Sequence, residues 1–155
     1  MRIPTLLFVL LAIQACASGT RPVLPADAVV VAGANAAGLL HPCSRDAPLA
    51  VEGTWQPRVE DILAIERVLR QTLVSRPPYG DADWSKAPSG WRRQYVGIVR
   101  NGHRYIYGSF FPKHAMDDRS WRAEPVVYCD GGPRYFSIEY DPASRRMTLA
   151  FNGEA

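Results

Sequence analysis

The chain has no strong excess of charge of either sign and no apolar run long enough to cross a bilayer. Among its 155 residues, 18 basic and 15 acidic side chains leave a formal net charge of +3. So small a charge gives no reason to expect a nucleic-acid partner. The apolar run 6–13 is far shorter than the roughly 20 residues of a membrane-spanning helix.

Motifs for catalysis and cofactor binding are also missing. The sequence has no Cys-x-x-Cys pair, no Gly-x-Ser-x-Gly context and no phosphate-binding glycine loop. Of the three histidines, His114 lies near Asp117 and Asp118, but zinc sites need three or four ligands of good geometry. We therefore predict no cofactor and no metal, and we expect that the chain is not an enzyme.

The N-terminal residues form the clearest pattern that is present. A basic residue, Arg2, is followed by the apolar run and then by Gln14-Ala15-Cys16, which is typical of a secretory signal. We predict a signal peptide over residues 1–15. Ile13-Gln14-Ala15-Cys16 resembles the lipobox of bacterial lipoproteins, with a branched apolar residue three before the cysteine and a small residue directly before it. The resemblance covers residues 1–16 alone.

This resemblance implies a diacylglycerol on the Cys16 sulfur, cleavage before Cys16 and usually a third acyl chain, such as palmitate, on the freed amine. Two or three chains would hold the protein firmly in a bilayer, since each buried methylene contributes roughly 0.8 kcal/mol. Ala17 stands where an aspartate would favour inner-membrane retention, so we expect an outer-membrane lipoprotein facing the periplasm. The alternative is an ordinary signal peptide cut after Ala15 or Ala17, with Cys16 incidental.

The two remaining cysteines suit an oxidising compartment. If Cys16 carries lipid, Cys43 and Cys129 are free to pair, and we predict a structural disulfide between them. The alternative is that one of them is a nucleophile. Residues 16–42 are rich in Ala, Val, Gly and Pro, and we expect the lipidated cysteine and a flexible tether there, with 29–31 as a possible short strand. Residues 43–155 are then one globular domain.

The clearest helix is predicted over 57–75. Its apolar residues follow the three-and-four spacing of one helix face, with Pro57 at the first helical position and an i,i+4 pair formed by Glu66 and Arg70. The helix is expected to stop at Arg76, before two prolines. A long loop over 76–90 follows it.

The second half of the domain has the alternation of β-strands. Strands at 92–100 and 103–111 flank Asn101-Gly102, which favours a type I′ turn and sets Arg100 opposite His103. The same register places Tyr95 opposite Gly108. After an irregular stretch, 112–124, further strands are predicted over three ranges: 125–129, 134–140 and 146–151.

These elements predict an α+β fold, with one long amphipathic helix packed on a four- to five-stranded antiparallel meander. The order resembles the cystatin-like class of folds in architecture alone, without a family motif, so it says little about function. We therefore predict a cell-envelope lipoprotein with a non-enzymatic binding domain. Its partner is an envelope polymer or a protein, such as an envelope-acting enzyme or toxin that it inhibits in the manner of an immunity protein.

Aromatic side chains in loops and a histidine at the hairpin tip make up the candidate binding surface: Tyr79, Trp84, His103 and Tyr135. Two other functions stay open. One is an envelope hydrolase that uses Asp130 with Glu139 or His103. The other is a structural or assembly lipoprotein without a ligand. Against the hydrolase, Asp130 and Asp141 each precede turn-forming residues, where such side chains often cap their own backbone.

Overall fold

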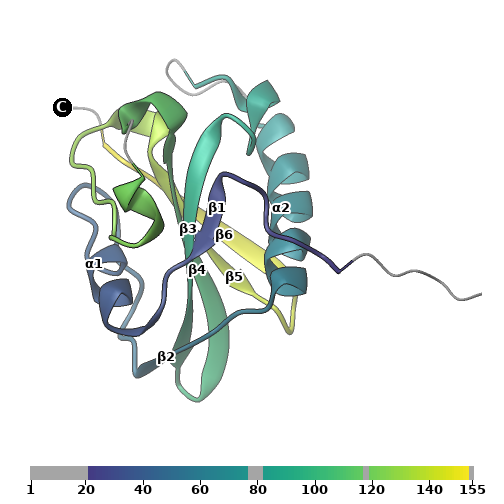
Figure 1. The fold of residues 1–155 in the computed structure, drawn as a ribbon, viewed down its shortest axis with the longest axis vertical. Helices are drawn as coiled ribbons and strands as arrows, with labels where there is room; N and C mark the ends of the chain where they lie inside the picture. The colour runs from purple at the N-terminus through teal and green to yellow at the C-terminus, as the bar shows by residue number, and fades with distance from the viewer. Residues whose placement is uncertain (1–20, 77–81, 117–118, 154–155) are drawn as a thin grey trace, which may run out of the picture.

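The structure, a computed structural model, describes residues 21–76, 82–116 and 119–153. One main helix and a six-stranded, mostly antiparallel sheet form a mixed α+β fold (Figure 1), as the sequence predicts. The predicted lipidation site Cys16 and the candidate Tyr79 lie outside the described residues.

Five of the strands follow one another across the sheet in the order β1-β3-β4-β5-β6. β2 lies off this path and pairs with β3. β1 is parallel to β3, and every other pairing is antiparallel. The strand bounds are β1 (Ala28–Val30), β2 (Gly53–Trp55), β3 (Trp91–Arg100), β4 (His103–Pro112), β5 (Phe136–Asp141) and β6 (Arg146–Phe151).

The predicted meander therefore holds from β3 to β6, and two strands were not foreseen as part of it. β1 pairs with residues 93–95 of β3 and β2 with residues 97–99, so both use the edge of β3 that β4 leaves free. The β3–β4 register is as predicted, with Arg100 opposite His103 and Tyr95 opposite Gly108. The two-residue turn explains this success, because its length fixes the pairing of every residue behind it.

The main helix is α2 (Val59–Val74), two residues shorter at its start than predicted. Pro57 precedes the N-cap residue, Arg58, whose backbone N–H donates to the Asp61 carboxylate at 3.0 Å. Asp61 thereby satisfies a polar group at the helix end, as acidic residues at the third position commonly do. The predicted apolar face is the buried one: Ile62, Ile65, Leu69 and Leu73 have no exposed surface.

Two strand glycines make room for large side chains between α2 and the sheet. A Cβ atom on Gly108 would lie 2.9 Å from the ring of Tyr95, the residue predicted opposite it. A Cβ on Gly97 would lie 2.4 Å from the Trp55 carbonyl oxygen and 2.7 Å from its ring. Gly97 is thus covered by Trp55 of β2, whereas Ile106 is only its cross-strand neighbour.

An ion pair joins α2 to the middle of the sheet. Arg93 donates to both carboxylate oxygens of Glu66, at 2.7 and 3.1 Å, and the Tyr95 hydroxyl donates to the same carboxylate at 2.8 Å. The side chains of Arg93 and Glu66 are only 4% and 11% exposed. Glu66 was predicted to pair with Arg70 on the helix surface, but its carboxylate is turned inward, toward β3.

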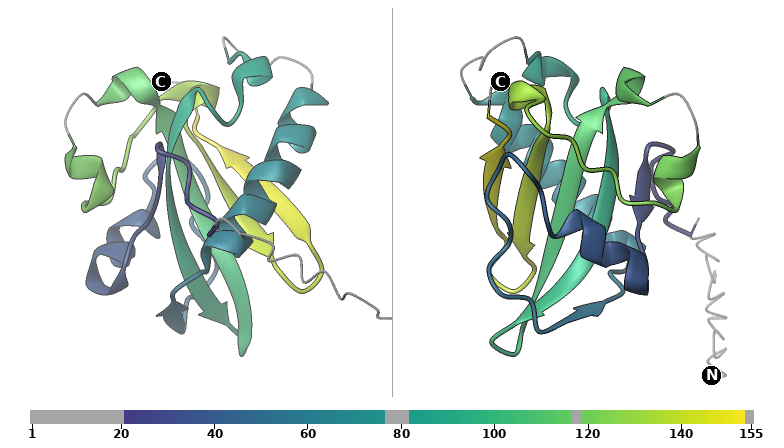
Figure 2. Two further views of the ribbon diagram at one scale, coloured as in Figure 1. Left: turned by 45° about the vertical axis from the view of Figure 1, so that its right-hand side comes forward. Right: turned by 90° about the vertical axis from the view of Figure 1, so that its left-hand side faces the viewer.

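The opposite face of the sheet is covered by shorter elements (Figure 2). A 3-10 turn (Gly33–Asn35) leads into α1 (Ala36–Leu39), and Ala36, Leu39 and Leu40 are buried against β3 and β4. The prediction of a flexible tether over 16–42 is therefore wrong for residues 28–40. The apolar residues of this segment cover a face of the sheet that would otherwise be exposed to water. Further 3-10 turns lie at Trp84–Lys86, Lys113–Ala115, Ser120–Arg122 and Gly132–Arg134.

The strand predicted over 125–129 does not form. The Val126 N–H donates to the side-chain oxygen of Gln94 at 2.8 Å, and the Gln94 amide donates to the carbonyls of Trp121 and Glu124. A buried side chain thus replaces the strand partner that this segment lacks. The segment ends at Cys129, which forms the predicted disulfide with Cys43, with their Cα atoms 5.3 Å apart.

We expect Glu66→Gln to lower the free energy of unfolding by about 3 kcal/mol, because it leaves the buried Arg93 guanidinium without a carboxylate. Urea unfolding measures this change. The matched control is Glu60→Gln on the exposed face of the same helix, for which we expect a change within about 0.5 kcal/mol. Equal losses in the two variants would contradict a structural role for the ion pair.

The stability should also fall at alkaline pH. Burial, and then the neighbouring Glu66 charge, raise the pKa of Tyr95 well above its usual value. Because the folded state holds this proton more tightly than the unfolded state, the contribution is complete below about pH 10 and is lost as the pH rises further. Tyr95→Phe should flatten this part of the pH profile of unfolding. An unchanged slope in the variant would refute the assignment to Tyr95.

Candidate functional site

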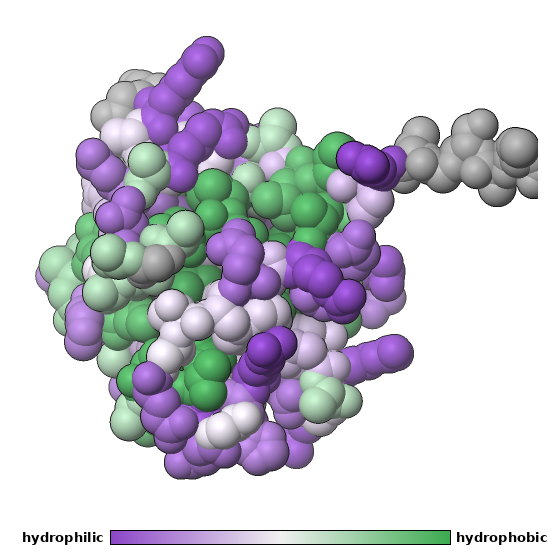
Figure 3. Space-filling view, turned by 60° about the horizontal axis from the view of Figure 1, so that its bottom comes forward, coloured by the Kyte–Doolittle hydropathy of each residue, from purple (hydrophilic) through white to green (hydrophobic). Residues whose placement is uncertain are grey.

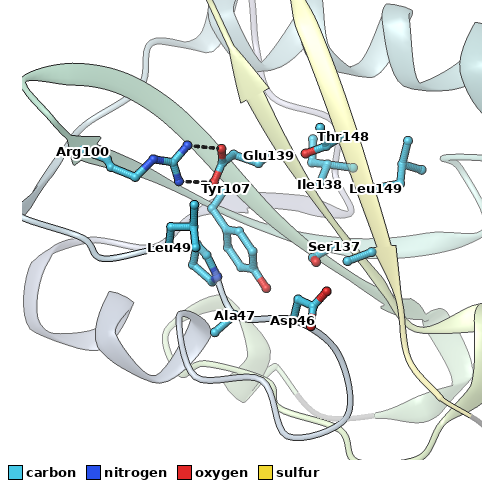
Figure 4. A pocket seen from close by; sticks show the side chains of 12 residues that line it. Asp46, Ala47, Leu49, Arg100, Tyr107, Ser137, Ile138, Glu139, Thr148 and Leu149 are labelled. Carbon is cyan, nitrogen blue, oxygen red and sulfur yellow. Dashed lines mark hydrogen bonds and ion pairs between the residues drawn. The ribbon is translucent and has the colours of Figure 1, made fainter.

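A pocket of about 300 Å³ lies on the sheet face opposite α2, between strands β4 to β6 and the loop 46–49 (Figure 4). Its polar lining comes from side chains that are far apart in the sequence: Asp46, Arg100, Tyr107, Ser137, Glu139 and Thr148. Pro48 and Leu49 form an apolar rim, and Leu49 is 72% exposed.

The pleat of the sheet explains why these side chains meet. Successive residues of a strand point to opposite faces, so Phe136 and Ile138 of β5 enter the core under α2, while Ser137 and Glu139 face the pocket. The antiparallel register then places Tyr107 beside Glu139, and Thr148 beside Glu139 on its other side. The floor is therefore a short polar strip that runs across three strands.

One end of the pocket is closed by an ion pair. Arg100 of β3 donates two hydrogen bonds to the Glu139 carboxylate, at 2.8 and 2.5 Å, and its guanidinium lies 4.3 Å from the centre of the Tyr105 ring. The hydrogen bond to Glu139 is the main cause that raises the pKa of Arg100. Both charges are thereby compensated, and Glu139 is held as a hydrogen-bond acceptor for Arg100.

The Tyr107 hydroxyl is the unusual group of the pocket. Tyr107 is 2% exposed, and its hydroxyl has no hydrogen-bond partner among the described residues. Figure 4 shows that it points toward Asp46 and Ser137. An unpartnered buried hydroxyl costs about 1–3 kcal/mol, so folded proteins seldom retain one without a use or a bound partner.

The pocket's loop wall is fixed to the sheet. Arg45 donates to the Ser109 hydroxyl at 2.9 Å and also to the side-chain oxygen of Asn152. The Gly153 N–H donates to the Ser44 carbonyl at 3.0 Å, and the disulfide begins at the preceding Cys43. The loop that carries Asp46 and Leu49 therefore follows directly after a segment held by a covalent bond and by partly buried polar contacts.

A second, larger hollow of about 490 Å³ lies near the β3–β4 turn, lined in part by Trp55, Asp61, His103 and Asp141. In Figure 3, hydrophilic side chains surround patches of hydrophobic surface at this end of the molecule. Its carboxylates already have structural roles. Asp61 accepts a hydrogen bond at the start of α2, and Asp141 accepts from the Ala143 N–H and the Ser144 hydroxyl at 2.9 and 2.6 Å.

The candidate binding surface predicted from the sequence does not form one site. His103 is exposed at the hairpin tip, as expected. Trp84 is only 4% exposed because it stacks on Trp91 and meets the edge of Phe136, so its prediction as a surface aromatic is wrong. Tyr135 is likewise buried, under Tyr128, with ring centres 4.4 Å apart, and burial is the main cause that raises the pKa of Tyr135 to about 12.

Asp130 and His103, one of the two pairs considered for hydrolysis, lie at different ends of the sheet. Phe136, which is near Asp130 in the chain, pairs with Phe110 of β4. Phe110 is seven residues along β4 from His103. At 3.4 Å per residue, Phe110 and His103 are separated by about 24 Å along the strand. Asp130 is exposed in the turn after the disulfide, with a φ of 54°, and its backbone N–H donates to the Ser44 hydroxyl oxygen at 2.9 Å. Asp130 and His103 are therefore not brought together.

Other features add no second site in the part of the chain that the structure describes. His114 is exposed, and Asp117 and Asp118 lie outside that part. No group of three or more His, Cys, Asp or Glu side chains among the described residues is arranged to hold a metal ion. Across the same ranges, no helix combines the length and the apolar character that a membrane span requires.

Comparison of the chain with protein-family models, curated proteins and solved structures finds no match. The sequence signal for the pocket was weak. Ser137 and Glu139 could be assigned to the polar face of β5, but no local pattern indicated that Arg100 and the loop 46–49 would close that face into a pocket.

Replacing each of two tyrosines by phenylalanine should distinguish a hydroxyl that stabilises the fold from one that has no hydrogen-bond partner. Tyr95→Phe removes a hydrogen bond to Glu66, and we expect it to lower the free energy of unfolding by about 1–2 kcal/mol. Tyr107→Phe should leave that free energy unchanged or raise it, because no partner loses a bond. Urea unfolding of both variants tests this. A loss at Tyr107 as large as that at Tyr95 would show a structural role for the Tyr107 hydroxyl.

Proposed function

We propose that this protein is an exported cell-envelope lipoprotein whose domain binds a partner without catalysing a reaction. The observation that carries the binding role is the pocket over β4 to β6, with the unpartnered Tyr107 hydroxyl in its wall. The partner is an envelope polymer or an envelope-acting protein that the domain inhibits. In the same proposal, α2 on the strands β3 to β6 is a cystatin-like arrangement of a long amphipathic helix on a meander.

The lipid anchor rests on the sequence around Cys16 and is supported by the other two cysteines. The sequence has three cysteines, and Cys43 and Cys129 form a disulfide with each other. Cys16 is therefore the one cysteine that is not used in the disulfide. A lipobox cysteine in an outer-membrane lipoprotein would carry diacylglycerol and an amine-linked chain such as palmitate. The domain would then face the periplasm, where an oxidising environment maintains the disulfide.

A binding role is favoured over hydrolysis by the uses of the carboxylates. Glu139 accepts two hydrogen bonds from Arg100, and Asp141 caps its own turn. Hydrogen bonds from Ser144 and from the Ala143 backbone N–H lower the pKa of Asp141. A glycosidase needs one carboxyl group with a raised pKa, facing a second across the substrate. The lowered pKa of Asp141 is the opposite of what the acid role needs, and both oxygens of the Glu139 carboxylate are engaged by Arg100.

The anchor is tested by metabolic labelling of the full chain in a bacterial host with radioactive palmitate. We expect the label and a position in the outer-membrane fraction, and we expect Cys16→Ser to lose both. Ala17→Ser is the matched control, since it changes the neighbouring position while keeping the thiol. A native protein that carries no lipid by intact mass would refute the anchor.

The binding role is tested in the same cells with a photo-crosslinking amino acid at Leu49 on the pocket rim. The control position is Val127, which is also exposed, on the segment before the disulfide. A stoichiometric adduct at Leu49 but not at Val127 supports the proposal. Turnover of peptidoglycan by the purified protein that disappears in Asp130→Asn would replace it with the hydrolase, and absence of both results would leave an assembly lipoprotein without a ligand.

A further inference from the structure

We propose that the pocket between β4 to β6 and the loop 46–49 binds a neutral saccharide, with sugar hydroxyls bonded to Asp46 and Tyr107. This inference rests on the proposed binding function and names the chemical class of its ligand. Its starting point is that the pocket offers unused hydrogen-bonding groups of both kinds, while its charges are already balanced.

The charge balance disfavours an ion as the ligand. Arg100 and Glu139 compensate each other through two hydrogen bonds within the pocket. Asp46 in the pocket follows directly after Arg45, whose guanidinium is bound to the neutral side chains of Ser109 and Asn152. The four charges around the pocket sum to zero. An anion would have to compete with Glu139 for Arg100, and a cation would find Asp46 as the one carboxylate of the pocket lining that is not already paired.

The unused groups call for a ligand that both donates and accepts. The buried Tyr107 hydroxyl has a proton to donate and lone pairs to accept, and Asp46 is an exposed carboxylate that only accepts. Figure 4 shows the Tyr107 hydroxyl and the Asp46 side chain at the same corner of the pocket. Two adjacent hydroxyls of a sugar ring can accept from Tyr107 and donate to Asp46 at the same time.

The apolar rim of the pocket suits the C–H faces of a sugar ring. Leu49 is 72% exposed and stands beside Pro48, so an apolar surface borders the polar floor. A pyranose ring has the same division, with C–H groups on its faces and hydroxyls around its edge. The volume of about 300 Å³ is at the small end of ligand pockets, which fits one or two sugar units better than a folded partner's loop.

The test is isothermal titration of the purified, full-length acylated protein in a detergent without a sugar head group. The probes are a trimer of N-acetylglucosamine and a trimer of glucose. Spermidine, inorganic phosphate and a blocked alanine dipeptide represent cationic, anionic and peptide ligands. We expect saturable binding of at least one saccharide and weaker or no binding of the other three probes.

Two pocket variants and one control locate the site. Tyr107→Phe removes one hydrogen bond and Asp46→Asn removes the charge of an acceptor, and each should weaken saccharide binding by about tenfold. Asp130→Asn changes an exposed carboxylate outside the pocket and should leave the affinity unchanged. Circular dichroism and urea unfolding of each variant separate a lost contact from a lost fold, and a destabilised Tyr107→Phe is replaced by Thr148→Val as the second pocket variant.

Three results would overturn the saccharide proposal: no saturation with either trimer, affinities unchanged in both pocket variants, or tighter binding of a charged or peptide probe. A protein adduct at Leu49 in cells, together with any of these results, would keep the proposed binding function and reject the saccharide. If the protein binds a saccharide but carries no lipid, the proposed ligand class is kept and the proposed lipid anchor is rejected.

Discussion

The ion pair between Glu66 of α2 and Arg93 of β3 lies between helix and sheet with very little exposure to solvent. Its two hydrogen bonds, with a third from Tyr95, fix both the position of α2 along the sheet and its rotation about its own axis. Arg93 also donates to the backbone carbonyls of Pro88 and Trp91, which ties the start of β3 into the same network. Because a buried charge without its partner is costly, alternative packings of the helix are disfavoured.

With α2 fixed, the two faces of the sheet have different roles. The face under α2 is filled by aromatic and aliphatic side chains, including the stacked pair Phe110 and Phe136 with ring centres 4.5 Å apart. The other face is covered by α1 next to β3 and β4, and by the segment around Trp121. Over β5 and β6 the pocket remains, bounded by the loop 46–49. The pocket is therefore the part of the sheet that the short covering elements do not fill.

The polar groups on that second face are divided between structure and recognition. Gln94 holds the segment 121–126, and Arg45 holds its own loop against Ser109 and Asn152. Gln94 is buried and Arg45 is partly buried, and the hydrogen bonds of both side chains hold loops against the sheet. Tyr107 and Asp46 stand in the same region without such bonds among the described residues, and for that reason the binding and saccharide proposals are built on them.

The sequence by itself determined the elements whose information is local. The stripe from Ile62 to Leu73 specified the helix face, and Asn101-Gly102 fixed the β3–β4 register. The two cysteines outside the lipobox, Cys43 and Cys129, predicted the disulfide. Only the tertiary structure decided that residues 28–40 cover the sheet, that Trp84 and Tyr135 are buried, and that Glu66 turns inward. It also decided that Arg100, Asp46 and Tyr107 line one pocket. The physical reason is that burial and charge pairing depend on which segments meet in space, and residues 45–49 and 137–150 lie far apart in the sequence and meet only in the folded structure.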